Sequence, residues 1–128
     1  MERKNISTGT PWEKAYGYSR AVRIGNIIEV AGTVASDEAG AVQGETVYEQ
    51  TRYILTKIEQ ALVEAGGSLS DVIRTRWYLT DITKLDEAGR AHGDVFGEVR
   101  PVSTAVEVSA LAGSGFLIEI EARAVLSG

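Results

Sequence analysis

The chain has 128 residues, the length of one ordinary domain, and 44% of them are hydrophobic. Its 18 acidic residues outnumber the 13 lysines and arginines, and the net charge of −5 argues against a nucleic-acid binder that works through a broad basic surface. The lack of cysteine excludes disulfides and thiolate chemistry, and the single histidine excludes any two-histidine mechanism and most metal sites.

The N-terminal residues contain no apolar segment of the kind found in signal peptides. No apolar run approaches the roughly 20 residues that a membrane span needs. We therefore expect a cytoplasmic protein without membrane contact, folded as one domain over residues 1–128. The residues before position 11 give no clear structural signal.

Two strand-like segments come first in the pattern, at residues 18–24 and 27–34. Gly25 and Asn26 separate them, and this pair favours a two-residue hairpin turn because glycine adopts the positive φ that such a turn requires. A loop rich in Gly, Ala and Asp is predicted at residues 35–44.

A long amphipathic helix is predicted from about Thr46 to Ala65. Its apolar residues recur at helical spacing and form one stripe: Val47, Ile54, Leu55, Ile58, Ala61, Leu62 and Ala65. The Gly66–Gly67 pair that follows favours the end of the helix.

The next segment, residues 72–80, has the alternation of a strand. One face is expected to carry Ile73, Trp77 and Leu79, and the other Arg74, Arg76 and Tyr78. Two arginines on one face indicate either an anion site or a row that faces solvent or another subunit.

A second helix is predicted from about Lys84 to Gly97, followed by strands at residues 103–109 and 116–126. On or near one face of this helix lie Leu85, Ala88, His92, Val95 and Phe96. In the last strand the alternation is nearly complete, with one side formed by Phe116, Ile118, Ile120, Ala122 and Ala124.

These elements follow the order ββαβαββ and predict an α+β fold, a mixed sheet with two helices on one face. Two helices cannot cover both faces of such a sheet. The uncovered face is expected to carry Ala31, Thr33, Glu119, Glu121 and Arg123. Such semi-polar residues suit a subunit interface or a cleft, so the pattern predicts an oligomer.

His92 is the candidate general base, because histidine is the side chain that titrates near neutral pH. A packed or interface histidine is the alternative. Glu119 and Glu121 share a strand face and need partners, since an unpaired buried charge is costly. They form either a structural ion network or a catalytic carboxylate with its support, and their spacing fits both.

Two further patterns favour structural roles. Asp81, Asp86, Asp94 and Glu98 lie on or beside the second helix and are interpreted as its solvated side, so no metal site is predicted. The Ala-Gly-Ser-Gly sequence at residues 112–115 lacks the lysine and the following helix of a phosphate loop, and indicates a turn.

Several short motifs, taken in order, resemble those of the Rid family, the YjgF-type reactive intermediate deaminases. They are Gly17-Tyr18-Ser19-Arg20-Ala21-Val22, Gly25-Asn26, Ala31-Gly32, Pro101-Val102-Ser103-Thr104-Ala105-Val106-Glu107-Val108 and Ile118-Glu119-Ile120-Glu121-Ala122. The resemblance runs from about Ile6 to Val125, with matching length and motif spacing.

This resemblance implies a fold similar to chorismate mutase of the Bacillus type. It also implies a homotrimer with three clefts between subunits, each of which takes a small-molecule ligand. Family members with an assigned function hydrolyse reactive enamines and imines to a carbonyl product and ammonia, and they use no metal or organic cofactor.

Carried over by position, Tyr18 matches the tyrosine of the family's Gly-x-Tyr motif, and Glu119 matches the glutamate that positions water. The resemblance therefore implies that these two residues are catalytic. Active deaminases have Pro-Ala-Arg where this chain has Pro101-Val102-Ser103. A serine cannot reproduce the two-pronged ion pair between that arginine and the substrate carboxylate.

Two other site positions also differ from the family pattern. The family's Ser-Gly is Ala31-Gly32 here, and the asparagine expected on the second helix falls at Gly89. The resemblance implies that Ala31 and Gly32 bind substrate with Ser103, while Arg100 and His92 are expected to shape selectivity beside them. The chain thus resembles a branch of the family that lacks the arginine.

Two functions remain open at this point. The first is hydrolysis of a reactive imine, enamine or related small carbonyl-derived metabolite that lacks the carboxylate anchor, with Tyr18 and Glu119 orienting water. The second is a non-catalytic trimer that binds a small ligand and serves a regulatory role. A ribonuclease, a label often attached to this family, fits poorly with the net charge of −5 and the lack of a basic stripe.

Overall fold

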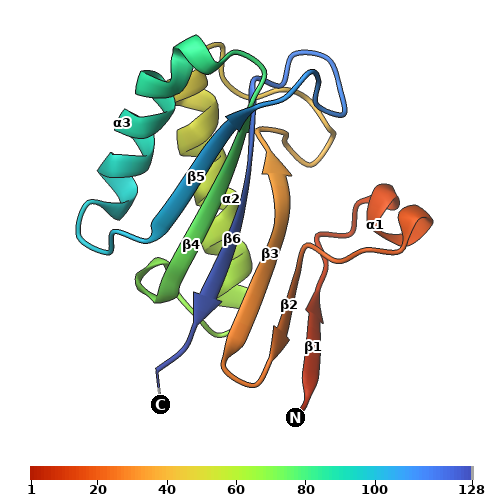
Figure 1. Cartoon of the computed structure of the whole chain (residues 1–128). Helices are drawn as coiled ribbons and strands as arrows, with labels where there is room; N and C mark the ends of the chain where they lie inside the picture. Colours follow the sequence, from red (N-terminus) through yellow and green to blue (C-terminus); the bar gives the residue numbers. More distant parts are fainter. Residues whose placement is uncertain (128) are drawn as a thin grey trace.

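The computed structural model describes residues 1–127, in which six strands form one sheet with two long helices on one face (Figure 1). In spatial order the strands are β1 (Arg3–Ile6), β2 (Ala21–Ile24), β3 (Ile27–Val34), β6 (Ile118–Val125), β4 (Val72–Leu79) and β5 (Val102–Glu107). The β4–β5 pair is parallel, and the other neighbouring pairs are antiparallel. The predicted α+β fold with a mixed sheet is confirmed.

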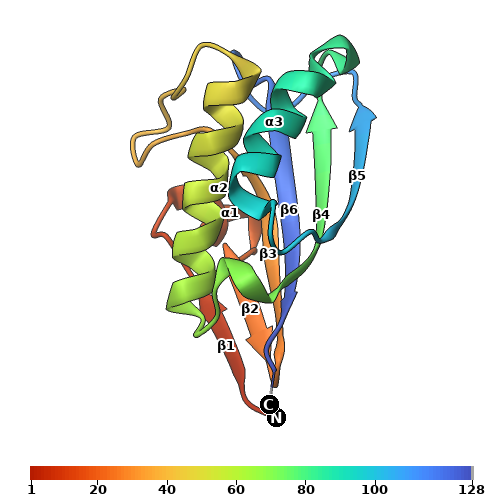
Figure 2. The same ribbon diagram turned by 90° about the vertical axis from the view of Figure 1, so that its left-hand side faces the viewer.

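The helices α2 (Val47–Glu64) and α3 (Leu85–Phe96) lie side by side on one face of the sheet (Figure 2). We call the opposite face the open face. Helix α2 begins after Thr46 because Thr46 and Glu49 form a reciprocal capping box. Its predicted apolar stripe is buried against β3 and β6, together with Gln50 and Thr51. Short 3₁₀ turns precede β4 and α3, at η1 (Leu69–Asp71) and η2 (Ile82–Lys84).

Two short N-terminal elements are absent from the sequence prediction. Strand β1 pairs with β2, but Ile6 is its one buried residue, so it has no alternation to detect. Helix α1 (Pro11–Tyr16) follows and stands away from the sheet (Figure 1). Pro11 suits the first helical position, and Gly17 ends the helix with a φ of 76° in the left-handed region. Residues 18–20 connect α1 to the sheet, so β2 is shorter than predicted.

Register shifts in two strands move side chains to the face opposite the predicted one. The β4–β6 register shifts between Val72 and Arg74, and Ile73 is 46% exposed where the alternation predicts the core. The β3–β6 register shifts between Val30 and Thr33, and Thr33 is therefore buried on the helix side and not on the open face.

Helix α3 buries Ala88, His92 and Phe96, as its apolar pattern predicts. Leu85 differs, because its side chain lines an open groove and stays 41% exposed. Within residues 1–127, no helix combines the length and the apolar character that crossing a bilayer requires.

Candidate functional site

Glu119 lies on the open face of β6, opposite Val34 of β3 and Tyr78 of β4. Its carboxylate lies against the backbone of Gly32, where a Cβ atom would come within 2.5 Å of Oε2. Burial raises the pKa of the Glu119 carboxyl, and the neighbouring Arg20 opposes this rise. Within residues 1–127 this carboxylate accepts no hydrogen bond, so its oxygens are available to a water molecule or a ligand.

Arg20 lies near this carboxylate, and Tyr18 lies near Arg20, both on the connection between α1 and β2. The Arg20 Nη1 donates to the carbonyl of Gly32 at 3.3 Å and to Oγ1 of Thr33 at 3.2 Å. Its guanidinium carbon lies 6.0 Å from the centre of the Tyr18 ring, which is partly exposed. We call Tyr18, Arg20, Gly32 and Glu119 the carboxylate cluster. The sequence analysis did not assign a role to Arg20.

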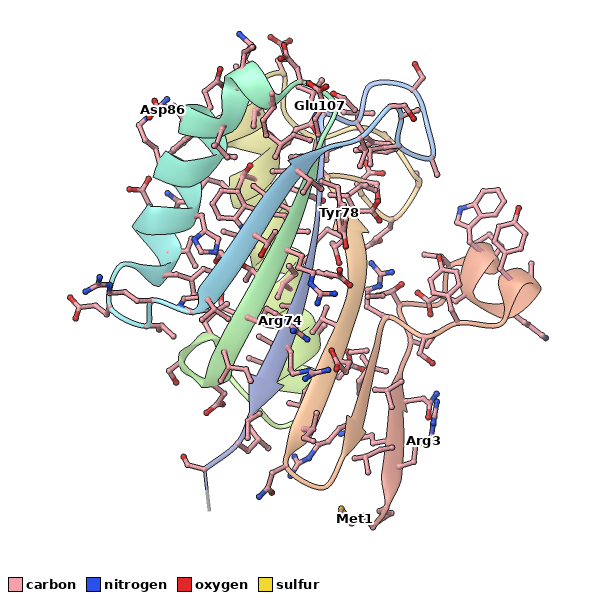
Figure 3. The ribbon with its side chains drawn as sticks, in the orientation of Figure 1. Met1, Arg3, Arg74, Tyr78, Asp86 and Glu107 are labelled. Carbon is pink, nitrogen blue, oxygen red and sulfur yellow. The ribbon has the colours of Figure 1, made fainter. Side chains whose placement is uncertain are left out.

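A separate charged network occupies the rest of the open face. Glu121 accepts a hydrogen bond from the Tyr78 hydroxyl and lies 3.7 Å from Arg76. The hydrogen bond to Glu121 raises the pKa of the Tyr78 phenol. Arg123 pairs with Glu29 at 2.6 Å. Tyr78 and Arg74 point toward the viewer from this face in Figure 3. Of the two neighbouring glutamates, Glu121 thus belongs to the ion network, whereas Glu119 is free of it.

A groove of about 590 Å³ lies between β5 and α3, at the other end of the sheet from the N-terminus. Its lining residues are Trp77, Leu85, Asp86, Gly89, Arg90, Ser103, Thr104 and Ala105. The two charged ones, Arg90 and Asp86, pair with each other at 3.3 Å. The groove therefore has an apolar floor and hydroxyl groups, and its charges balance.

Ser103 reaches His92 from this groove through one intermediate hydroxyl. Thr75 Oγ1 lies 2.7 Å from Ser103 Oγ and 2.9 Å from His92 Nε2, and it accepts a hydrogen bond of 2.9 Å from Trp77 Nε1. The His92 ring packs between Trp77 and Phe96, with centroid separations of 4.5 and 4.7 Å. Burial lowers the pKa of His92 to about 4, so the imidazole is neutral at physiological pH. Of the two interpretations of His92, the geometry supports the packed histidine.

Within one protomer the site residues fall into two separate groups. Glu119 lies on the open face, whereas the Ser103 hydroxyl reaches Thr75 and His92 on the helix side, with β4 between their strands. Ala31 is part of the β3 irregularity beside the carboxylate cluster. Arg100 lies exposed in the turn before β5, with a left-handed φ of 54° and its N–H bonded to the carbonyl of Phe96 at 2.8 Å.

Of the four acidic residues interpreted as the solvated side of α3, Asp81, Asp86 and Asp94 have structural contacts. Asp81 accepts from the N–H of Thr83, and Asp94 accepts from the Tyr48 hydroxyl and pairs with Arg52. A search of residues 1–127 finds no group of three or more His, Cys, Asp or Glu side chains that could hold a metal ion.

Comparison with known proteins decides the family. The sequence profile described as Endoribonuclease L-PSP matches residues 10–126. The chain belongs to this family.

Among curated members of this L-PSP family, also called the YjgF, RutC or Rid family, the RutC family protein PYRAB12510 of Pyrococcus abyssi is 40% identical over 108 residues. The match covers 84% of each chain. The crystal structure of Rv2704 from Mycobacterium tuberculosis, a member of the YjgF/YER057c/UK114 family, has a TM-score of 0.90 and 48% identity. It covers 98% of this chain and 100% of that one. NMB1025 from Neisseria meningitidis, a YjgF family protein, has a TM-score of 0.83, 29% identity and coverage of 100% and 98%. The expected chorismate-mutase-like fold is confirmed.

Two of the three departures from the Rid-family pattern lie in the groove, whereas the third, Ala31, lies beside the carboxylate cluster. Ser103 and Gly89, which stand where active deaminases carry arginine and asparagine, both line the groove between β5 and α3. Tyr18 and Glu119, which match the pattern, both lie in the carboxylate cluster. The chain thus keeps the tyrosine and the glutamate of the family pattern and changes both pattern positions that line the groove. Thr75 and Trp77 contact Ser103 and His92 directly or through each other. The sequence carries no functional signal for them, because both are residue types that are common in strands.

Proposed function

We propose that this Rid-family protein is a cytoplasmic homotrimer that hydrolyses a small imine or enamine without a carboxylate, at sites formed between protomers. The observation that carries the proposal is the half-buried carboxylate of Glu119, which lies against Gly32 near Arg20 and accepts no hydrogen bond within residues 1–127. A half-buried carboxylate that has a raised pKa and accepts no hydrogen bond within residues 1–127 is suited to take a proton from water.

The separation of the two residue groups supports the proposed assembly. Ser103 and Glu119 lie on opposite faces of one protomer's sheet, so a ligand held by both requires two protomers. In the proposed trimer the groove of one protomer faces the carboxylate cluster of the next. The charged network on the open face supplies complementary partners for such a contact, since it holds three arginines and two glutamates: Arg74, Arg76, Arg123, Glu29 and Glu121.

The proposed reaction is the addition of water to a carbon–nitrogen double bond. Glu119 accepts a proton from the water as the water oxygen bonds to the imine carbon, and this proton then passes from Glu119 to the nitrogen. The resulting carbinolamine collapses, the carbon–nitrogen bond breaks, and the products are a carbonyl compound and ammonia. Tyr18 orients the water. Arg20 favours the ionised form of the Glu119 carboxyl, which the first step needs in order to accept a proton.

The test uses imines formed in situ and a trapping reagent. A flavin-dependent amine oxidase would supply imines without a carboxylate, and an amino-acid oxidase would supply imines with one. Semicarbazide gives the same semicarbazone from the imine and from its carbonyl product, but it reacts faster with the imine. We therefore expect the protein to lower the initial rate of semicarbazone formation, chiefly for the imines without a carboxylate. Glu119→Gln is expected to reduce the hydrolysis rate about 100-fold or more, since a positioned base contributes 10²–10⁴.

Glu59→Gln is the matched control, because Glu59 is exposed on α2 and distant from both residue groups. It should retain the wild-type rate. Equal rates for wild type and Glu119→Gln, with or without acceleration over buffer, would contradict the proposed role of Glu119.

The replacement of the family's arginine by Ser103 favours a second candidate function, a non-catalytic trimer that binds and senses a small ligand. The groove holds no unpaired cation, because Arg90 is paired with Asp86. Saturable ligand binding without any change in imine lifetime would support this candidate against the hydrolase.

A further inference from the structure

We propose that the Ser103–Thr75–His92 chain is a hydrogen-bond switch that lets the groove bind an uncharged group, either a donor or an acceptor, with His92 as the positioning residue. This inference rests on the proposed function only in taking the groove as the ligand site. It deepens that function by assigning the class of ligand group that meets Ser103.

The switch follows from counting protons at Thr75. A threonine hydroxyl donates one hydrogen bond and accepts two. The indole N–H of Trp77 can only donate, and at 2.9 Å it occupies one of the two acceptor positions. Of the two remaining neighbours, His92 and Ser103, one must therefore donate to Thr75 and the other must accept from it.

Two arrangements satisfy this condition. In the first, Ser103 donates to Thr75, and Thr75 donates to Nε2 of His92, whose proton is then on Nδ1. The Ser103 oxygen presents its lone pair to the groove, where it can accept from a ligand. In the second, His92 carries its proton on Nε2 and donates to Thr75, and Thr75 donates to Ser103. The Ser103 proton then points away from Thr75, and a ligand acceptor can take it in place of the Pro101 carbonyl, which lies 3.5 Å from Ser103 Oγ.

Geometry favours a switch of hydrogen bonds over a general-base relay. The His92 ring is packed between Trp77 and Phe96 and is 8% exposed, so accepting a proton from Ser103 would create a cation in an apolar setting. Its low pKa agrees with this. Exchange of one neutral tautomer for the other creates no charge and needs no movement of the ring. Because the lining charges are paired with each other, the groove adds no electrostatic reason to select an anion.

The test reads the tautomer of His92 directly. His92 is the single histidine of the chain, so its two ring nitrogens can be assigned without ambiguity in ¹⁵N NMR spectra of the full-length protein. Two uncharged five-membered rings serve as probes: cyclopentanone, which only accepts, and pyrrole, whose N–H only donates. Their binding is followed through the backbone amides of Gly89 and Ala105 in the groove.

We expect cyclopentanone to shift His92 toward the Nε2–H tautomer and pyrrole to shift it toward the Nδ1–H tautomer. In Ser103→Ala, Thr75 has no acceptor other than His92, so the Nδ1–H tautomer should dominate with either probe. Ser103→Thr keeps the hydroxyl and should keep the response, which separates loss of the hydroxyl from loss of the fold.

The outcomes distinguish this inference from the function on which it rests. Binding of both probes with an unchanged His92 tautomer, or an undiminished response in Ser103→Ala, would overturn the switch and leave the groove as a ligand site. If neither probe changes the amide chemical shifts of Gly89 and Ala105, the groove is not a ligand site for these groups, and the switch is overturned with it. Neither result depends on whether imine hydrolysis is observed.

Discussion

A Cβ atom on Gly32 would lie 2.5 Å from Oε2 of Glu119, so the carboxylate occupies space that a side chain at position 32 would fill. The φ angle of Gly32 is not in the left-handed region, and the backbone there accepts an alanine. Glycine is needed at position 32 to leave room for the Glu119 carboxylate, not to allow a special backbone conformation.

Gly32→Ala is therefore expected to displace the Glu119 carboxylate and to reduce imine hydrolysis at least 10-fold, the scale of loss that a misplaced reacting group produces. The semicarbazide assay measures the rate, and circular dichroism checks the fold. Gly93→Ala is the control, because no atom lies within 4 Å of its added Cβ inside α3. It should keep full activity and stabilise the helix by about 1 kcal/mol.

Ser103→Arg tests whether position 103 selects the ligand. An arginine there would place a guanidinium in the groove, where it can form a two-pronged ion pair with a carboxylate. We expect hydrolysis of carboxylate-bearing imines to rise about 10-fold or more relative to imines that lack a carboxylate, since hydrogen bonds to charged groups contribute about 1.5–3 kcal/mol. Ser103→Gln adds length without charge and should leave the ratio unchanged. An equal rise in both variants would show that bulk, not charge, sets the preference.

His92 makes the stability of the protein depend on pH. Burial lowers its pKa from 6.5 to about 4, so between these values the unfolded chain binds a proton that the folded chain does not. The contribution is fully present above pH 6.5 and is lost as the pH falls toward 4, by up to about 3 kcal/mol.

Urea unfolding at fixed protein concentration across this pH range measures the effect. His92→Gln keeps a polar group beside Thr75 and should lose most of this pH dependence. The pH dependence due to Glu119 remains in both wild type and variant. That contribution has the opposite sign, because burial raises the pKa of the Glu119 carboxyl and favours its protonated form in the folded state. If the free energy of unfolding changes with pH in the same way in wild type and His92→Gln, this pH dependence does not come from His92.

The open face provides a test of assembly. Arg76 lies 3.7 Å from Glu121 in a network that also holds Tyr78. Arg76→Glu reverses a charge in this network, so we expect the variant to be monomeric by light scattering and the wild type to be trimeric. Arg52→Glu, on the exposed side of α2, should remain trimeric. A monomeric wild type would contradict the proposed site between protomers.

The fold could be predicted wherever a long periodic segment carries its own signal. Helix α2 has both an apolar stripe and the Thr46–Glu49 capping box, and its observed bounds agree with the pattern. Strand β1 could not be found, because four residues with one buried side chain carry no period. The faces of Ile73 and Thr33 could not be assigned, because a register shift depends on how the partner strand pairs.

Some residues of the candidate site could be named from the sequence, but their arrangement could not. Tyr18, Glu119 and Ser103 could be selected by resemblance, but their division between two faces of the sheet follows from the strand order, which a linear pattern does not contain. Thr75 illustrates the limit. Its hydroxyl joins three side chains, yet threonine is among the most ordinary residues of a strand.

The two edges of the sheet differ in how they would meet another chain. Strand β1 carries Arg3 and Lys4, and charged side chains of this kind discourage the addition of a further strand. Strand β5 exposes Val102 and Val106 along a hydrogen-bonding edge that has no neighbour in the protomer. If the proposed trimer comes apart, the β5 edge of each separated protomer is therefore the surface where irreversible aggregation is expected to begin.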